Sequence, residues 1–304
     1  MRFSSVLLSA LAMLLALAPA ARAEPVDATP RIAVLSAYEP EWKALEGLSA
    51  DAVLTKYKGV SFVTGTLEGK KVVLVLTGIS MVNAAMTAQM ALDRYNVTRI
   101  VFTGVAGGVD PALSIGDIVV PDRWGQYLEA IFARETAKGF ELPPGSTTDL
   151  PNFGMIFPRG VRVFREGQDG APRQFWFPVD AAMLEVARSA GKGVALERCT
   201  PTTVCLVKAP QVVVGGNGVS GQAFVDNADF RAYVFDTFRA QVLDMETAAV
   251  AHVAATNAVP FIAFRALSDL AGGGPGANEI RIFEQLAANN SVAVMRAFLR
   301  ALPP

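Results

Sequence analysis

The sequence contains very little histidine and cysteine, the residues on which most compact metal centres are built. Its 304 residues include one histidine, His252, and two cysteines, Cys199 and Cys205. A zinc-type site needs about four such ligands close together, whereas His252 lies far from the cysteines in a helical Ala-Val-Ala-His-Val pattern. The sequence therefore predicts no metal site, and we expect His252 to be a packed helix residue.

The two cysteines lie close to each other and are flanked by Thr and Pro. In an oxidising compartment such a pair favours a disulfide, which here would close a short surface loop. A pair of free thiols is the alternative, and metal binding would require further ligands that the chain does not offer nearby. We predict a disulfide between Cys199 and Cys205.

The chain also lacks a strong charge of either sign. Its formal net charge is −1 and no basic stripe appears along it, so nucleic acid is not an expected partner. After the N-terminus, no segment reaches the run of about 20 apolar residues that a membrane-spanning helix needs. We therefore expect neither nucleic acid nor a membrane as a partner of the mature protein.

The N-terminal segment has the pattern of a secretory signal. Met1-Arg2 gives it a positive start, residues 6–18 are almost entirely apolar, and Pro19 interrupts the run. Ala21-Arg22-Ala23 then has the small-x-small form of a signal-peptidase site. We predict that residues 1–23 are a signal peptide and that the protein is periplasmic or secreted. An uncleaved anchor and a buried first helix are the alternatives; no cysteine follows the site, which argues against a lipoprotein.

The remaining chain, residues 24–304, has the size of one large domain. It contains 304 − 23 = 281 residues, and single hydrophobic cores grow to about 250–300 residues. Loss of Arg2 and Arg22 from the 27 basic residues leaves 25 against 28 acidic ones, a net charge of −3. We find neither an internal repeat nor a linker that would divide this segment.

Apolar runs typical of strands alternate with helical periods along most of the chain. The expected strands are residues 31–36, 60–67, 71–77, 99–103, 115–120, 204–208, 211–214, 242–245 and 260–265. The expected helices are residues 39–48, 80–95, 180–190, 226–238, 246–257 and 280–302. This alternation predicts an α/β fold: a single three-layer domain with a mixed central sheet flanked by helices.

Two segments depart from the alternation. Residues 104–108, Gly-Val-Ala-Gly-Gly, are expected to form a tight glycine loop. Residues 124–174 are rich in Pro, Gly, Phe and Arg and show no clean period. We interpret the region at about 124–175 as an insertion that leaves the domain surface, because loops of such length are usually functional or poorly ordered.

Four segments come directly after apolar runs. They are residues 36–41 and 104–108, Met245-Glu246 and Ser268-Asp269. Ligands of open α/β sheets bind at the carboxyl ends of the strands, so these segments are expected to meet in one crevice. Two acids there can flank one small molecule. One accepts hydrogen bonds from hydroxyls as a carboxylate, and the other donates a proton. Cleavage of a sugar–base bond requires both roles.

Taken singly, each of these residues also has an ordinary structural interpretation. Asp269 can be a turn cap, Glu246 a first-turn acid favoured by the helix dipole, and Glu41 a solvated helix residue. Arg265 can be a structural ion-pair partner and Phe224 a core residue. Their joint placement, rather than any one of them, favours an active site.

At these positions the sequence resembles the purine nucleoside phosphorylase and nucleosidase superfamily, and within it the methylthioadenosine/S-adenosylhomocysteine nucleosidases. The resemblance runs from about Arg31 to Leu302, apart from the insertion. Its motifs are Ser36-Ala37-Tyr38-Glu39-Pro40-Glu41, Thr103-Gly104-Val105-Ala106-Gly107-Gly108, Asp244-Met245-Glu246 and Arg265-Ala266-Leu267-Ser268-Asp269. The stretches at 224–228 and 268–274 look closest to a secreted branch that includes plant bark and vegetative storage proteins.

The resemblance implies a nucleoside phosphorylase-like fold and a division of catalytic roles. Asp269 would protonate N7 of a purine base, with Ser268 orienting it and with a pKa raised by its surroundings. Glu41 would take a proton from the attacking water, which Arg265 would help to place. Glu246 would accept hydrogen bonds from the ribose hydroxyls.

The resemblance also implies substrate contacts. Met245 would pack beneath the sugar, Phe224 would stack on the base, and Val225 would pair with the base edge through its backbone. The segment from Gly104 through Ala106 to Gly107 would approach the nucleoside closely, which small residues allow. A homodimer is implied as well, with the apolar helix at 81–92 as a possible interface; no metal or organic cofactor is implied.

Water rather than phosphate is the expected nucleophile. Phosphorylases of this superfamily carry an Arg and a Ser around the first glycine of the glycine motif, where this chain has Phe102 and Val105. Apolar side chains cannot neutralise a phosphate dianion, which normally draws on Arg forks. We therefore predict an exported purine nucleoside N-ribosyl hydrolase acting on adenosine-type nucleosides. The 5′ substituent is not predicted, because the insertion replaces a region that shapes that side of the pocket in relatives.

Two alternatives remain open. One is a phosphate-dependent purine nucleoside phosphorylase that draws phosphate ligands from Arg159, Arg162 and Arg165 in the insertion. The other is a non-catalytic nucleoside-binding or storage protein on the same fold. The joint presence of Glu41, Glu246 and Asp269 favours an enzyme over the storage protein.

Overall fold

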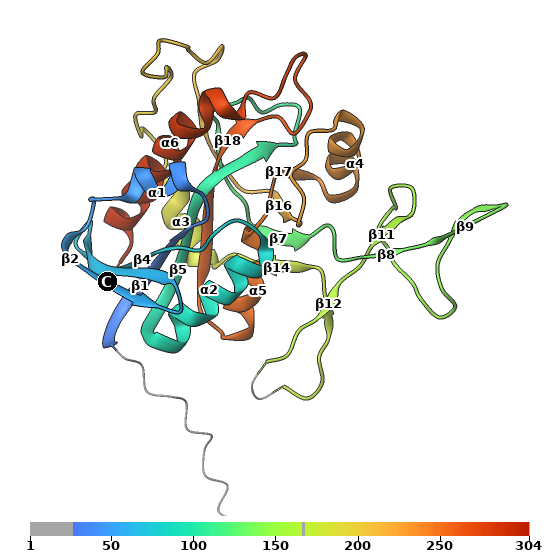
Figure 1. Ribbon diagram of the computed structural model, residues 1–304, viewed down its shortest axis with the longest axis horizontal. Coiled ribbons are helices and arrows are strands. Elements are labelled where there is room, and N and C mark those ends of the chain that lie inside the picture. The colour runs from blue at the N-terminus through green and yellow to red at the C-terminus, as the bar shows by residue number, and fades with distance from the viewer. Residues whose placement is uncertain (1–26, 166–167, 304) are drawn as a thin grey trace, which may run out of the picture.

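A mixed sheet of twelve strands forms the centre of the protein in the computed structural model, which describes residues 27–165 and 168–303 (Figure 1). The predicted signal peptide, residues 1–23, lies outside the described residues. The strands of this sheet are β1 (Asp27–Ser36), β2 (Ala50–Tyr57), β3 (Val60–Leu67), β4 (Lys70–Leu76), β5 (Tyr95–Gly108), β6 (Ile118–Val120), β7 (Arg123–Gln126), β14 (Trp176–Pro178), β15 (Val212–Val214), β16 (Asn217–Ser220), β17 (Ala240–Asp244) and β18 (Phe261–Asp269).

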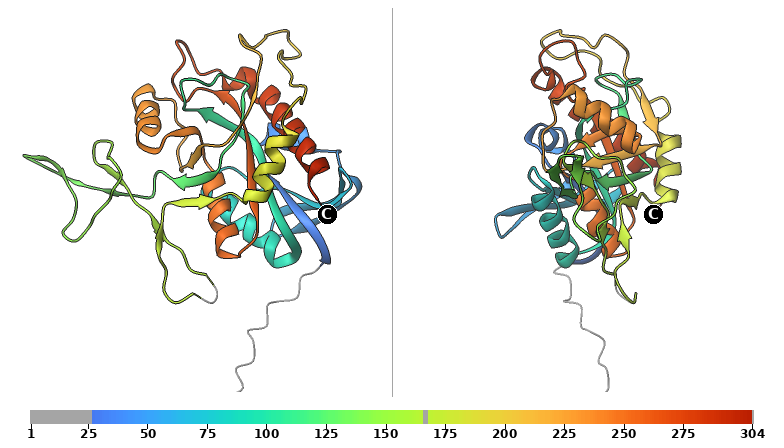
Figure 2. Two further views of the ribbon diagram at one scale, coloured as in Figure 1. Left: turned by 180° about the vertical axis from the view of Figure 1, so that it is seen from behind. Right: turned by 90° about the vertical axis from the view of Figure 1, so that its right-hand side faces the viewer.

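Helices cover both faces of this sheet. They are α1 (Glu39–Leu45), α2 (Met81–Arg94), α3 (Ala181–Ala190), α4 (Ala228–Phe238), α5 (Thr247–Thr256) and α6 (Ile280–Ala301). Helix α6 packs on β18 and β5 and contacts α1 and α3, whereas α2 and α5 pack on each other and on the other face (Figures 1 and 2). The predicted three-layer α/β fold is confirmed. Within the described chain, no helix combines the length and the apolar character needed to cross a bilayer.

The two strands at the centre carry the residues that matter most. β5 pairs in parallel with β1 on one side and with β18 on the other. All nine residues of β18 are buried, as expected for a parallel strand covered on both faces. The register sets Arg265 opposite Gly104 and Asp269 opposite Gly107, so the two motifs lie side by side.

Two sequence predictions about local structure are wrong. Residues 104–108 form no tight loop but continue β5, because glycines that disfavour strands in isolation are held here by pairing with β18. Residues 204–208 form no strand, since they belong to the loop around the disulfide, and Val207 is 93% exposed. The sequence did not predict four strands of the sheet: the largely exposed β2, the glycine-containing β16, and β7 and β14.

The predicted insertion at 124–175 begins and ends inside the sheet. Its flanks are β7 and β14, which pair antiparallel with each other. The segment between them forms strands that pair only two by two and projects from the body of the molecule (Figures 1 and 2). These are β8 (Ala130–Phe132), β9 (Arg134–Thr136), β10 (Gly139–Glu141), β11 (Ile156–Pro158), β12 (Val161–Arg162) and β13 (Arg173–Gln174).

The predicted disulfide between Cys199 and Cys205 is present in the structure. The loop that it closes is attached to α6. Asn290 accepts a hydrogen bond from the backbone N–H of Glu197 at 2.7 Å and donates one to its carbonyl at 2.8 Å. Leu206, next to Cys205, packs in a small apolar cluster with Phe283 and Leu286 of α6. The disulfide therefore fixes a loop that rests against the N-terminal half of this helix.

Candidate active site

A cavity of about 420 Å³ opens at the carboxyl ends of the central strands. All four segments expected to meet in a crevice contribute to its lining, together with residues 223–225 and the start of α6. Of the residues predicted for the site, the lining includes Glu41, Ala106, Gly107, Phe224, Val225, Met245, Glu246, Ser268 and Asp269. Arg265 and Gly104 lie behind this lining rather than in it.

Glu41 enters the cavity from the first turn of α1. Its carboxylate accepts backbone hydrogen bonds from Ala37 at 2.6 Å and Tyr38 at 3.0 Å through one oxygen, and from Val105 at 2.8 Å through the other. Only 2% of Glu41 is exposed, so it is not the solvated helix residue that the sequence alone allowed. Burial raises the pKa of Glu41, against the opposing effects of Arg265 and the backbone donors.

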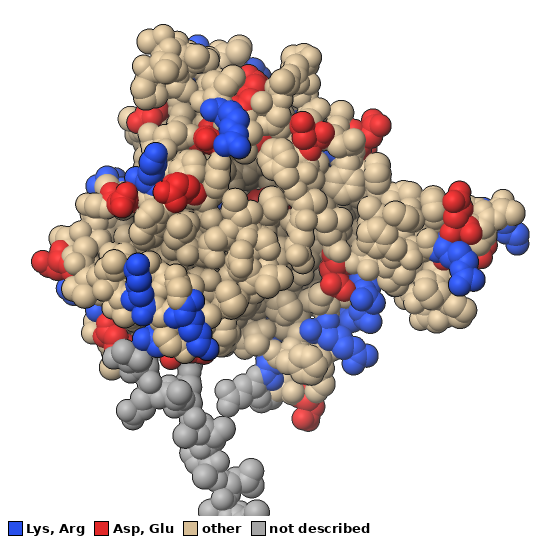
Figure 3. Space-filling model, in the orientation of Figure 1, with Lys and Arg blue, Asp and Glu red and all other residues tan. Residues whose placement is uncertain are grey.

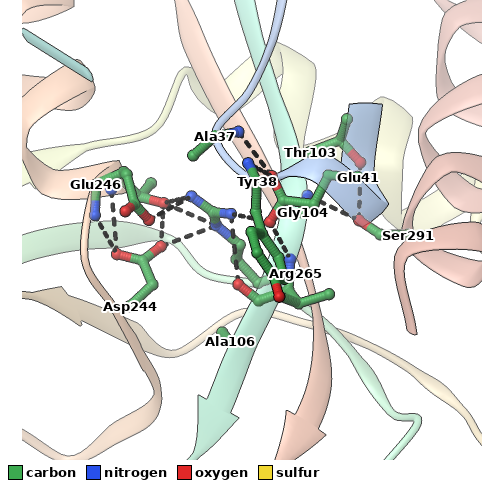
Figure 4. A network of polar contacts seen from close by, with 12 residues as sticks. Ala37, Tyr38, Glu41, Thr103, Gly104, Ala106, Asp244, Glu246, Arg265 and Ser291 are labelled. Carbon is green, nitrogen blue, oxygen red and sulfur yellow. Dashed lines mark hydrogen bonds and ion pairs between the residues drawn. The ribbon is translucent and has the colours of Figure 1, made fainter. Parts of the chain in front are cut away.

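Arg265 lies behind the cavity at the centre of a charged network (Figure 4). Its Nε atom is 2.8 Å from Asp244 Oδ2, while its Nη1 atom is 3.6 Å from Glu41 Oε1 and its Nη2 atom 4.0 Å from Glu246 Oε2. The fully buried guanidinium lies 4.2 Å from the centre of the Phe102 ring. Arg265 therefore orients the carboxylates from behind and acts as a positioning residue.

Gly104 makes room for this network. A Cβ atom at this position would lie 2.3 Å from both Arg265 Nη1 and Glu41 Oε1. The resemblance implied that Gly104 lets the backbone approach a ligand, whereas in the structure its missing side chain lets two charged groups approach each other. Ala106 and Gly107, further along β5, do line the cavity.

Glu246 lies at the start of α5 with one oxygen in a hydrogen bond and the other toward Arg265. Its Oε1 accepts a hydrogen bond from the backbone N–H of Ser80 at 2.8 Å. Burial, followed by repulsion from Asp244, raises the pKa of Glu246 to about 8. Arg265 Nη2 lies 4.0 Å from this carboxyl, so Arg265 stabilises the negative charge of Glu246 less than that of the nearer Asp244.

Asp244 and its partners form the part of the site that the sequence motifs did not assign. Asp244 accepts hydrogen bonds from Ser220 Oγ at 2.5 Å and from the backbone N–H groups of Glu246 and Thr247 at 3.1 Å. The Thr247 hydroxyl bonds both to Asp244 and to Arg265. Asp244 lies within the Asp-Met-Glu motif, so the sequence could have identified it as a site residue. No motif indicated Ser220 or Thr247.

Asp269 ends β18 on the cavity wall. Its Oδ2 atom accepts a hydrogen bond from Ser268 Oγ at 3.0 Å, and its Oδ1 atom accepts one from the backbone N–H of Ala271 at 2.8 Å. Asn278, which no motif indicated, donates to Oδ1 at 3.4 Å. Burial raises the pKa of Asp269 above its ordinary value, and these donors oppose the shift. Asp269 therefore combines the turn-capping contact with the elevated pKa expected of a proton donor.

The remaining predicted contacts form an apolar part of the cavity. Phe224 is 56% exposed and not a core residue, Val225 is buried, and Met245 is half-buried. His252 lies outside the cavity, where it stacks on Phe177 with 4.7 Å between ring centres. Within the described part of the chain, no group of three or more His, Cys, Asp and Glu side chains is arranged to hold a metal.

The arginines considered as phosphate ligands do not reach the cavity. Arg159 pairs with Glu129 at 3.0 Å, and Arg165 donates to Gln174 at 3.0 Å. Neither these two nor Arg162 lines the cavity, whereas Arg281 of α6 does. Since the donors of Arg265 are directed at carboxylates, the described cavity contains no cluster of cations for a dianion.

The sequence matches the family described as the phosphorylase superfamily over residues 31–300. It is 28% identical to a 5′-methylthioadenosine/S-adenosylhomocysteine nucleosidase of Mycobacterium bovis, over 90% of this chain and 96% of that protein. It is also 28% identical to bark storage protein A of Populus deltoides, over 81% of this chain and 78% of that protein.

A solved structure with the same fold is the nucleosidase of that name from Colwellia psychrerythraea in complex with adenine. Its TM-score is 0.66 at 25% identity, and the match covers 92% of this chain and 96% of that one. The resemblance in the short motifs is therefore matched over nearly the whole domain, in both sequence and fold.

Proposed function

This chain belongs to the phosphorylase superfamily, and we propose that it is an N-glycosyl hydrolase that cleaves adenosine-type purine nucleosides with water as the nucleophile. The observation that carries the proposal is the convergence of Glu41, Glu246 and Asp269 on one cavity. The relatives named above support the activity, since the mycobacterial protein is a nucleosidase and the Colwellia structure contains adenine.

Protonation of the leaving base is the task of Asp269. A purine that departs as an anion is a poor leaving group, so a proton delivered to its N7 atom lowers the barrier. The raised pKa of Asp269 favours the protonated acid that this step needs. Ser268, with its hydroxyl 3.0 Å from the carboxyl, fixes the direction in which Asp269 points.

Attack by water is the task of Glu41. Three backbone donors and Arg265 hold the carboxylate of Glu41 in one orientation at the cavity wall. It takes a proton from water as the oxygen bonds to the anomeric carbon. The developing positive charge on the sugar is stabilised by the carboxylates around it, which are already oriented before the reaction.

Ribose binding is the task of Glu246. The 2′- and 3′-hydroxyls donate to its carboxylate, and such donors favour its ionised form and lower its raised pKa. Met245, also in the lining, supplies an apolar surface for the sugar, and Phe224 and Val225 supply one for the base. The absence of a cation cluster in the described cavity favours water over phosphate.

The decisive experiment measures free base released from adenosine, inosine, methylthioadenosine and S-adenosylhomocysteine, with and without phosphate. Release without phosphate that Asp269→Asn loses, while the exposed Asp229→Asn control keeps it, supports the proposal. Release only with phosphate identifies a phosphorylase. Tight binding of a nucleoside without release identifies a storage protein, the rival favoured by the similarity to bark storage protein A.

We also propose that the protein is exported after cleavage behind Ala23. The signal pattern supports this, as does the Cys199–Cys205 disulfide, because disulfides persist in oxidising compartments. N-terminal sequencing of the protein from a periplasmic or culture fraction should begin at Glu24. Recovery of the uncut chain from the cytoplasm would contradict export.

Finally, we propose a homodimer that covers the apolar groove that α2 and α5 line together with residues 126–132. This groove of about 700 Å³ is lined by Met81, Val82 and Phe132, among others, and Val82 is 61% exposed. The centre of the face shown in Figure 3, over these helices, carries few charged side chains. Helix α2 begins directly after Ile79 and Ser80, which adjoin the active-site cavity, so a partner there would lie close to the substrate.

A further inference from the structure

The side chain of Asn278 joins the carboxyl of Asp269 to a second carboxyl outside the cavity. Its Nδ2 atom donates to Asp226 Oδ1 at 3.1 Å and to Asp269 Oδ1 at 3.4 Å. Its Oδ1 atom accepts a hydrogen bond from the backbone N–H of Ile280 at 3.0 Å. A flipped amide would turn its oxygen toward two carboxyls and lose all three bonds. The network therefore directs the NH₂ group of Asn278 at Asp269.

Two loops that pack closely on each other hold this bridge. Asp226 directly follows the segment assigned to the base, and Asn278 lies near the end of the glycine-rich loop between β18 and α6. The backbone N–H of Asn227 donates to the Ala271 carbonyl at 3.1 Å. A Cβ atom on Gly272 would lie only 2.3 Å from the backbone nitrogen of Asn227. The positions of Asp226 and Asn278 are thus fixed by contact between two backbones.

The hydrogen bonds to Asp269 determine which of its oxygens carries the proton. Oδ1 accepts one bond from the backbone N–H of Ala271 at 2.8 Å and a second from Asn278. An oxygen whose two lone pairs accept N–H groups cannot also carry the acidic proton. That proton therefore belongs on Oδ2, the atom in contact with Ser268.

Asp226 and Asn278 act on the ionisation of Asp269 in opposite directions. The bond from Asn278 favours the carboxylate and lowers the pKa of Asp269, whereas the negative charge of Asp226 raises it. A general acid works best with a pKa near the working pH, because it must hold its proton until the substrate binds and then release it. A balance of two opposed neighbours meets that requirement.

We propose that Asn278 and Asp226 are positioning residues for proton transfer by Asp269. Asn278 confines the proton to Oδ2 and stabilises the carboxylate that remains, and Asp226 holds the amide of Asn278 in place. The inference rests on the proposed function. In the reaction the proton moves from Oδ2 to N7 and the electron pair of the glycosidic bond goes to the base, while water that Glu41 deprotonates supplies the hydroxyl of the sugar.

The experiment measures kcat/KM for base release against pH. The loss of activity with rising pH reports the ionisation of Asp269 in the free enzyme. Asn278→Leu has the same branched shape without the donor. It should move this limb of the profile up by roughly half a pH unit and lower the plateau roughly tenfold, the effect of one hydrogen bond to a charged group.

Asp226→Asn tests the other half of the bridge. It keeps an oxygen that can accept the bond from Asn278 but removes the charge. The same limb should therefore move down by roughly half a pH unit, with the plateau nearly unchanged. Asp229→Asn, an exposed change in the first turn of α4, removes an equal charge nearby and is the matched control. It should leave the profile where it is.

The other ionisable groups around Asp269 are the same in both variants, so opposite shifts cannot come from them. Outside the cavity lining these groups are Arg231 of α4, which contacts the glycine-rich loop, and Glu279 before α6. In the lining they are Tyr38, Glu41, Asp244, Glu246, Arg281 and Glu284.

Shifts in the same direction, or a limb that stays in place in either variant, would overturn the inference. Failure of the proposed function looks different, since the wild type would then release no base. In that case NMR titration of protein with ¹³C-labelled aspartate carboxyls gives the pKa of Asp269 directly, and Asp269→Asn identifies its signal. A pKa raised by Asn278→Leu and lowered by Asp226→Asn would still support the bridge, and unchanged values would refute it.

Discussion

At the scale of single residues, Gly104 has the most stringent requirement in the site. We expect Gly104→Ala to lower the free energy of unfolding by about 3–5 kcal/mol and to abolish turnover, because the added methyl would separate the buried Glu41 and Arg265. Chemical unfolding and base release measure the two effects. Gly276→Ala is the control, since a Cβ there meets nothing within 4 Å. An active Gly104→Ala protein of wild-type stability would contradict the account of this glycine.

Glu246 makes stability depend on pH. Its pKa rises from 4.5 to about 8 on folding, so the folded state binds this proton more tightly than the unfolded state. The resulting stabilisation is complete below about pH 4.5 and is lost as the pH rises through about 8.

We therefore expect the Tm of the wild type to fall between pH 5 and 9 by roughly 5 °C more than that of Glu246→Gln. Glu41, whose pKa is also raised by burial, should leave a slope of the same sign in the variant. If the Tm of both proteins changes equally with pH, the pKa of Glu246 is not raised in the folded state.

Sequence reasoning located the residues with chemically distinctive side chains and missed those that act through the backbone. Glu41, Glu246 and Asp269 were found because an acid after an apolar run is an informative pattern. Ser80 was missed because its contribution is an N–H group, presented by a backbone with φ of 98°. Asn278 was missed because it reaches Asp269 from a glycine-rich loop without a period.

At the scale of elements, the disulfide loop and α6 form one unit. The chain-entropy model assigns about 2 kcal/mol to a bond that closes so short a loop. We expect the Cys199→Ser/Cys205→Ser variant to lose about that much stability in urea unfolding. Wild type in reductant should match the variant, and the variant should not respond to reductant. Identical unfolding of the oxidised and reduced wild type would show that the bond contributes nothing.

Elements were predictable from the sequence where one period dominates. Strands β1, β4 and β18 and helices α2, α5 and α6 follow from apolar spacing. β16 was missed because Gly218 weakens the strand pattern; its hydrogen is needed where a Cβ would lie 2.7 Å from the Trp124 ring. The loop expected at 104–108 does not form, because tertiary packing rather than local preference fixes those glycines in β5.

At the scale of the whole molecule, the apolar groove lined by α2 and α5 leads to a prediction about assembly. If a second copy covers it, Val82→Asp should convert a dimer to a monomer in light scattering, because a charge would be buried without a partner. Val53→Asp is the matched control, since Val53 on β2 is 60% exposed and Val82 61%. A monomeric wild type, or a dimer unaffected by Val82→Asp, would refute this interface.

The three-layer architecture was predictable because the alternation of elements leaves few ways to bury their apolar faces. The strands inside the projecting insertion were not predictable, because they are two or three residues long and pair only with one another. Strands of that length leave no period in the sequence. Composition alone therefore predicted the position of the insertion but not its shape.

The attachment of the disulfide loop to α6 places a reducible bond next to the helix whose start lines the cavity. The bond forms only where thiols are oxidised, and its loop rests on the helix whose first turn lines the cavity. Reduction would open the loop while its contacts with Asn290, Phe283 and Leu286 remain. This side of the cavity would then keep its packing but lose the covalent closure of the loop behind it.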